Sequence, residues 1–178
     1  MFVKKKIVSE KKHLIFRALE PEDLDFLFEL ENNPEVWRVS ETIAPISRDT
    51  LRKFIASSYL DITQTHQARF IIVSLENNSA IGNIDLFDYD SINRRIGIGI
   101  LISKKYRGNH YSKDALELVM DYCFNVLFVH QIYCNIQKKN TVSLNLFQQL
   151  GFKIIGLKKE WYLSDNKWED EYLLQKLK

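Results

Sequence analysis

Hydrophobic residues recur along the chain with two periods, and the change from one period to the other predicts the order of its elements. The first part predicts a strand over 14–19, a helix that Pro21 opens and a second helix that Ser47 caps. The segment 35–46 between these helices follows neither period, so we expect it to be irregular. Three strands joined by short polar turns come next and predict an antiparallel meander over 70–75, 80–89 and 94–102.

From Ser112 onward the pattern takes the helical period and then alternates between strand and helix. A strand over 131–137 is followed by a helix that Gly151 is suited to end, because glycine adopts the left-handed conformation without strain. Two further strands are expected over 152–162 and 167–176. The predicted fold is an α/β (α+β) sandwich with a mixed, mostly antiparallel central sheet of about seven strands and about four helices.

Composition supports a single packed domain. The chain has 178 residues, of which 46% are hydrophobic and 12% aromatic, well above the range typical of disordered chains. It shows no internal repeat and no linker rich in proline, glycine or serine. At roughly 150 residues per domain, this length predicts one domain over 1–178.

Charge and cysteine usage exclude several classes of protein. The formal net charge is +2 and the isoelectric point is about 8.4, whereas nucleic-acid-binding domains usually have a basic stripe and a value above about 9. No apolar run approaches the roughly 18 residues of a membrane helix, and no export signal opens the chain. Cys123 and Cys134 lie outside any metal-ligand spacing. We therefore expect a cytoplasmic protein with no nucleic-acid, membrane or metal partner.

The segment with the clearest chemistry is the strand over 96–102 and the glycine-containing turn, 107–112, that leads into the next helix. Such a turn presents free backbone N–H groups and the positive end of a helix to a phosphate. Lys104, Lys105 and Arg107 could add charge-assisted contacts. One glycine before a helix is by itself more often only a turn.

Two sequence blocks together resemble the GNAT superfamily of acetyl-CoA-dependent N-acetyltransferases. The family turn, Arg/Gln-Gly-x-Gly-x-Gly/Ala, is similar to the run Arg107-Gly108-Asn109-His110-Tyr111-Ser112. A second family block is matched by Asn140, Ser143, Leu146 and Leu150-Gly151-Phe152. The opening 17–24 is similar to the branch that acetylates ribosomal-protein alanine, spermidine and diamines. The resemblance covers about 14–176, nearly the whole chain.

The resemblance implies an acetyl-CoA site between two parallel strands, 98–102 and 132–136, that splay apart. The pyrophosphate would bind the turn, the pantetheine arm would pair with the backbone of 100–102, and the oxyanion would meet the backbone at Ile100. The amine would attack the thioester directly, without a metal. The cofactor residues implied in this way are Ile100, Leu101, Ile102, Arg107, Gly108, Asn109, His110, Tyr111, Ser112, Asn140, Ser143 and Phe147.

The chain departs from the family pattern at three positions. His110 replaces the second glycine of the turn, and it can keep the backbone donors if it adopts the left-handed conformation. Phe147 replaces the tyrosine that protonates the departing thiolate; because a thiol has a pKa of about 8.5, its loss should slow the reaction without preventing it. Gly97 replaces the glutamate that often serves as general base.

Four residues are expected to contact the acceptor: Glu35, Trp37, Asp85 and Phe87. Asp85 could attract a cationic amine or accept its proton, or it could be an ordinary exposed acid of a strand. Trp37 could stack on an amine or fill the core. Gly97 and Gly99 leave one strand face bare, against which either a helix or a ligand would pack.

The sequence does not decide among several classes of acceptor amine. A small cationic amine such as a diamine or polyamine is favoured by Asp85 and by the similar branch; the alternatives are a protein N-terminus and an amino-sugar or antibiotic amine. A non-catalytic acyl-CoA-binding module is the competing class, because the usual acid and base are both replaced. The chain is expected to be a monomer or a homodimer.

Overall fold

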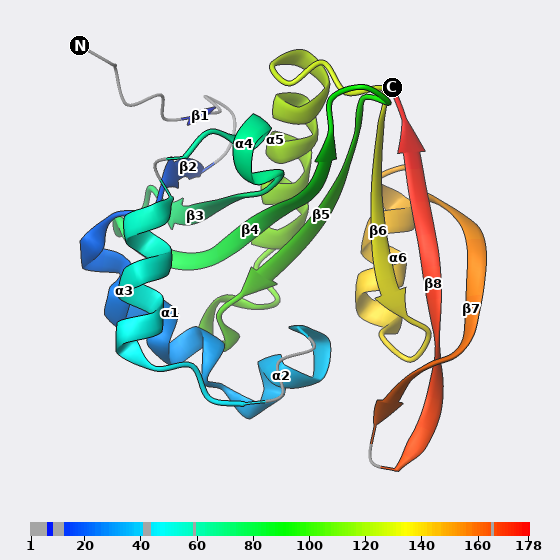
Figure 1. The fold of residues 1–178 in the computed structure, drawn as a ribbon, viewed down its shortest axis with the longest axis horizontal. Coiled ribbons are helices and arrows are strands. Elements are labelled where there is room, and N and C mark those ends of the chain that lie inside the picture. Colours follow the sequence, from blue (N-terminus) through cyan, green and yellow to red (C-terminus); the bar gives the residue numbers. More distant parts are fainter. Residues whose placement is uncertain (1–6, 9–12, 41–43, 59, 165) are drawn as a thin grey trace.

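The computed structural model describes residues 7–8, 13–40, 44–58, 60–164 and 166–178. Within them a single sheet of eight strands runs in the order β1-β2-β3-β4-β5-β6-β8-β7. The pair β5–β6 is parallel and the other neighbours are antiparallel. This confirms the predicted mixed, mostly antiparallel α/β sandwich (Figure 1). The strands are β1 Ile7–Val8, β2 Leu14–Ala18, β3 Ala68–Ser74, β4 Ser79–Asp90, β5 Arg95–Ile102, β6 Gln131–Gln137, β7 Lys153–Ser164 and β8 Lys167–Leu177.

Six α-helices are present in the described part of the chain, against the four or so expected. They are α1 Leu24–Glu31, α2 Pro34–Ser40, α3 Arg48–Ser57, α4 Ile62–Thr65, α5 Tyr111–Asn125 and α6 Thr141–Gln149. The additional helices are α2 and α4, and the additional strand is the two-residue β1. The expectation of an irregular segment over 35–46 is therefore wrong for 35–40, which belong to α2; residues 41–43 lie outside the described part.

Helices cover both faces of the sheet and create two cores. The larger core packs α5 and α6 against β2 to β6 and β8, with Ile84, Ile98 and Leu116 fully or almost fully buried. The smaller core packs α1 and α3 against β2 and β3, as Figure 1 shows on the opposite face. Cys123 and Cys134 are free and buried, and burial raises the pKa of the Cys123 thiol to about 12. Both cysteines therefore act as packing residues, as expected.

Local signals begin and end two of the helices where the sequence indicated. The Ser47 hydroxyl accepts a hydrogen bond from the Thr50 N–H at 3.0 Å and caps α3. Gly151 follows α6 with a φ of 87°, the left-handed conformation that ends a helix. In the described part of the chain, no helix is long and apolar enough to cross a membrane.

Candidate functional site

The parallel strands β5 and β6 pair only at their beginnings. Their register joins Arg95, Ile96 and Gly97 to Gln131, Ile132 and Tyr133, and no further pair links the two strands. On its other edge β6 pairs with β8 along its whole length, and β5 pairs with β4. Apart from the Ile102 carbonyl, which accepts a hydrogen bond from the Arg107 Nε at 3.0 Å, the edge of β5 over 98–102 that faces β6 has no strand partner and can pair with an extended ligand, in the manner of an added strand.

The turn before α5 has the geometry of an anion site. Gly108 has a φ of 83° and His110 a φ of 58°, so the histidine does adopt the left-handed conformation that the second family glycine would supply. Among the described residues, the backbone N–H groups of 108–112 have no hydrogen-bond partner. The Arg107 N–H differs from the expectation, because it donates to the Lys104 carbonyl at 3.3 Å. The available donors therefore run from Gly108 to Ser112.

Glu35 lies beside this turn instead of beside the acceptor. Its carboxylate is 2.7 Å from the Lys104 ammonium and 3.7 Å from the Arg107 guanidinium. All three side chains are about half-exposed or more. The assignment of Glu35 to the acceptor wall is therefore not supported; it neutralises two cations next to the proposed phosphate turn.

The second sequence block supplies a helix cap and a core residue. The Asn140 Oδ1 accepts a hydrogen bond from the Ser143 N–H at 3.2 Å, so this oxygen caps α6, while the amide nitrogen of Asn140 can still donate to a cofactor arm. Phe147 is 3% exposed and packs edge-on against Phe152 at 5.0 Å between ring centroids. The Phe147 side chain thus belongs to the core, which corrects the expectation that it contacts the cofactor.

A pocket of about 510 Å³ opens against the middle of β5, on the face of the sheet that carries α1 and α3. Asp85 and Phe87 line it, as expected for acceptor residues, together with Ile100 and Leu101. Trp37 does not line it; its indole N–H donates to the Glu31 carbonyl at 2.6 Å. The full lining is Glu31, Ile46, Thr50, Leu51, Phe54, Arg69, Asn83, Asp85, Phe87, Gly99, Ile100 and Leu101.

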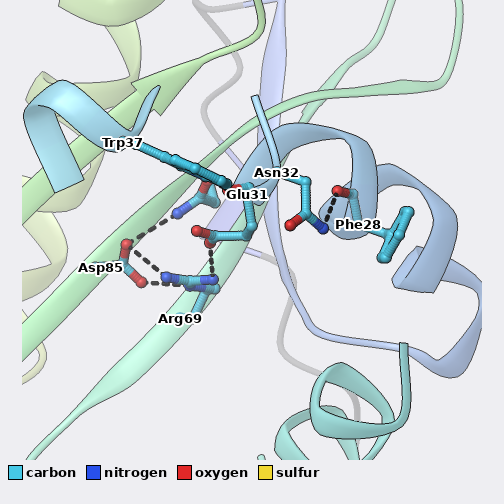
Figure 2. Close-up of polar contacts among 7 residues, drawn as sticks. Phe28, Glu31, Asn32, Trp37, Arg69 and Asp85 are labelled. Carbon is cyan, nitrogen blue, oxygen red and sulfur yellow. Dashed lines mark hydrogen bonds and ion pairs between the residues drawn. The ribbon is translucent and has the colours of Figure 1, made fainter. Parts of the chain in front are cut away.

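One guanidinium holds two carboxylates in this pocket. The Arg69 Nε and NH2 groups donate to the two oxygens of Asp85 at 2.5 and 3.1 Å, and its NH1 group donates to Glu31 at 2.5 Å. Figure 2 shows Arg69 between the two acids, with the Trp37 ring beside them. Burial lowers the pKa of Arg69, but the charges and hydrogen bonds of Asp85 and Glu31 raise it by more, so the guanidinium stays charged. Two carboxylates and one cation leave one net negative charge.

The glycines of β5 have different surroundings. A Cβ at Gly97 would lie 2.2 Å from the Phe87 ring, so the ring leaves no space for a larger residue at this position. At Gly99 the nearest atom to an added Cβ would be the Asp85 Cβ, at 4.0 Å. Gly99 therefore forms open floor of the pocket. This face of β5 is therefore covered by Phe87 at Gly97 and is open to the pocket at Gly99.

Tyr133 stands where β5 and β6 separate. Its hydroxyl donates to an Asp88 oxygen at 2.9 Å, and its ring packs edge-on against Phe87. Burial, reinforced by the hydrogen bond to Asp88, raises the pKa of Tyr133 to about 12. The hydroxyl therefore keeps its proton at neutral pH and cannot act as a base there.

Sequence reasoning missed Glu31, Arg69 and Asn83. Arg69 is paired in register with Asp85 across β3 and β4, but that pairing is not visible before the strands are aligned. Asn83 lies two residues before Asp85 on the same face of β4, a period-2 signal that was available. Glu31 ends a helix whose position over the sheet is a tertiary property.

This chain is similar to one family model and to several known proteins. Residues 13–153 match the family model of the acetyltransferase (GNAT) domain. The spermidine N(1)-acetyltransferase of Escherichia coli strain K12 is 30% identical over 142 residues, which cover 79% of this chain and 73% of that protein. The uncharacterized N-acetyltransferase p20 of Bacillus licheniformis is 27% identical over 94% of both chains. The Vibrio cholerae spermidine N-acetyltransferase, solved with CoA and spermine, superposes with a TM-score of 0.85 at 24% identity, covering 93% of this chain and 95% of that one.

Proposed function

The chain belongs to the GNAT acetyltransferase family and is an acetyl-CoA-dependent N-acetyltransferase, and we propose that its acceptor is a small cationic amine of the diamine or polyamine class. The observation that supports this acceptor most is the net negative charge of the Glu31–Arg69–Asp85 cluster in an otherwise largely apolar pocket. Apolar walls such as Leu51 and Phe54 suit a chain of methylene groups. The names of the relatives from Escherichia coli and Vibrio cholerae point to the same class.

The position of the charge favours an acceptor with two nitrogens. A primary alkylamine has a pKa of about 10.4, so only about one molecule in 10³ is neutral and nucleophilic at pH 7. Carboxylates beside the reacting nitrogen would stabilise its protonated form and oppose the attack. A diamine avoids this conflict, because one nitrogen can stay protonated at the acidic cluster while the other lies, as a neutral amine, against β5.

Asp85 is better suited to binding a cation than to accepting a proton. Its two oxygens already accept three hydrogen bonds, two from Arg69 and one from Asn83. A carboxylate offers about four lone-pair sites, so one remains to meet an ammonium group. Of the two active roles expected for Asp85, we therefore propose that it binds the amine.

The free backbone N–H groups indicate which residues bind the cofactor. We assign the pyrophosphate to the N–H groups of 108–112 and the pantetheine arm to the free edge of β5, including Ile100, Leu101 and Ile102; Arg107 already donates through its Nε to the Ile102 carbonyl at 3.0 Å. When bound, acetyl-CoA supplies an activated acetyl thioester. The backbone N–H at Ile100 would donate to the oxygen of that thioester. The departing thiol has a pKa of about 8.5, which makes an acid at the Phe147 position dispensable.

We also propose that the whole chain forms one domain and works in the cytoplasm as a monomer or homodimer. Its two free, buried cysteines suit a reducing compartment. Size-exclusion chromatography with light scattering would measure the mass of the assembly. A mass above that of a dimer would contradict this part of the proposal.

The test is CoA release from acetyl-CoA with a panel of amines. We expect turnover with 1,4-diaminobutane and longer polyamines at a kcat/KM at least about tenfold above that for an amino sugar or a peptide N-terminus. Calorimetry with acetyl-CoA alone serves as the control for cofactor binding. Preferred turnover of the sugar or the peptide would overturn the proposed acceptor. Tight acetyl-CoA binding with no turnover on any amine would favour the non-catalytic module.

A further inference from the structure

One residue of the pocket wall, Asn83, has a polar atom without a partner among the described residues. The Oδ1 of Asn83 is buried and accepts no hydrogen bond from any described residue, and the residue as a whole is 1% exposed. Buried carbonyl oxygens in folded proteins nearly always accept a hydrogen bond, because leaving one unpaired is destabilising. Because Asn83 lines the pocket, a bound ligand can supply the missing partner after a small movement of the amide, whose oxygen has almost no accessible surface in this structure.

The orientation of the Asn83 amide follows from its other end. Its Nδ2 donates to an Asp85 oxygen at 2.9 Å. Exchanging the amide oxygen and nitrogen would set an oxygen against the carboxylate, where neither atom has a proton to donate. The unpaired atom is therefore the carbonyl oxygen, a hydrogen-bond acceptor.

The surroundings of Asn83 indicate which kind of group would donate to its Oδ1. Asn83 and Asp85 share one face of β4 and lie opposite Leu101 and Gly99 of β5, two further residues of the pocket wall. The neighbouring cluster carries one net negative charge. A cationic N–H donor satisfies both the unpaired oxygen and this charge, whereas an anion or a pure acceptor satisfies neither.

We propose that Asn83 is an acceptor-binding residue whose Oδ1 accepts a hydrogen bond from the protonated, non-reacting nitrogen of the amine, while Asp85 and Glu31 supply the attraction for its charge. This assignment rests on the proposed cationic acceptor. It gives the pocket a directional requirement that charge alone does not impose. The site should distinguish an ammonium group, which has N–H donors, from a quaternary ammonium group, which has the same charge and none.

The experiment compares two ligands in the complex with CoA, which cannot react. Calorimetry measures the Kd of 1,4-diaminobutane and of its bis(trimethylammonium) analogue for the wild type, for Asn83→Ala and for the control Asn125→Ala, an exposed position on α5. The wild type and the control should bind the diamine at least about tenfold more tightly than the analogue. In Asn83→Ala this ratio should fall to at least about threefold below the wild-type value, because only the hydrogen bond to residue 83 is lost.

The outcomes separate this inference from the proposed function. An unchanged ratio in Asn83→Ala assigns the discrimination to the larger size of the analogue and overturns the inference, as does a wild-type ratio near unity. If Asn83→Ala does not fold, Asn83→Ser, which keeps a shorter oxygen acceptor, should give a ratio at least threefold below the wild type, and an unchanged ratio there again overturns the inference. Wild-type turnover of diamines together with any overturning result leaves the proposed function standing. Failure of the wild type to acetylate any diamine contradicts the function itself.

Discussion

The turn before α5 and the pocket on the face of the sheet that carries α1 and α3 are built from different parts of the chain. The turn offers backbone N–H groups from five consecutive residues, Gly108 to Ser112. The pocket offers side chains from α1, β3 and β4 that meet only in the folded protein, and its charged members are tied together by Arg69. A site made of backbone depends on local conformation, whereas a site made of side chains depends on identity and position.

This difference explains which substitutions each region tolerates. His110 replaces a family glycine and still holds a φ of 58°, so the donors of the turn are kept. In the pocket no such exchange is neutral, because Arg69, Asp85 and Asn83 each use specific atoms of the others. We infer that the turn fixes a cofactor common to the family, while the pocket determines the acceptor of this chain.

The largest effect is expected from removing the cation of the pocket. Arg69→Met removes the counter-charge of the buried Glu31 and of the partly exposed Asp85, which should lower the free energy of unfolding by about 3 kcal/mol, mainly through Glu31. Urea denaturation followed by circular dichroism measures it. The matched control is Arg48→Met, which breaks an exposed ion pair with Asp25 and should cost about 1 kcal/mol or less. Equal losses in the two variants would show that the pocket cluster has no special role in stability.

A smaller effect is expected from narrowing the pocket floor. Gly99→Ala adds a methyl group that touches nothing closer than the Asp85 Cβ, so the protein should fold normally while KM for a diamine rises by about tenfold. Gly97→Ala meets the Phe87 ring instead and should lower the free energy of unfolding by about 1–3 kcal/mol. Steady-state kinetics and urea denaturation on both variants separate these effects. An unchanged KM in Gly99→Ala would place the acceptor elsewhere.

The smallest effect is expected at the turn. Glu35→Gln frees Lys104 and Arg107 from an exposed acid, which should tighten CoA binding by about two- to threefold at low salt and by less at high salt. Calorimetry at two ionic strengths measures the change, and the exposed Glu29→Gln is the control. Weaker CoA binding in Glu35→Gln would mean that the carboxylate organises the turn instead of competing with phosphate.

The two regions also differ in how far the sequence predicts them. The turn is one continuous run, so Gly108, His110 and the helix that follows could be matched to the family motif without knowledge of the fold. Asp85 was singled out through the resemblance to the spermidine and diamine branch, but Arg69 joins Asp85 only through the register of β3 and β4. Glu35 was misplaced because α2 was not predicted; Trp37, on the same helix, bonds to Glu31. The residues that the sequence did not place correctly are those whose positions depend on contacts between distant segments of the chain.

We propose that the acidic pocket binds the acceptor and that the turn binds the cofactor independently of it. The most direct measurement is Asp85→Asn, assayed for kcat/KM with 1,4-diaminobutane and, by calorimetry, for the Kd of acetyl-CoA. Asp121→Asn, an exposed position on α5, is the control. We predict that kcat/KM falls by about tenfold or more, because the net charge of the pocket is lost, while the Kd of acetyl-CoA stays within about twofold of the wild type. Unchanged kcat/KM, or an equal loss of acetyl-CoA affinity, would contradict the account.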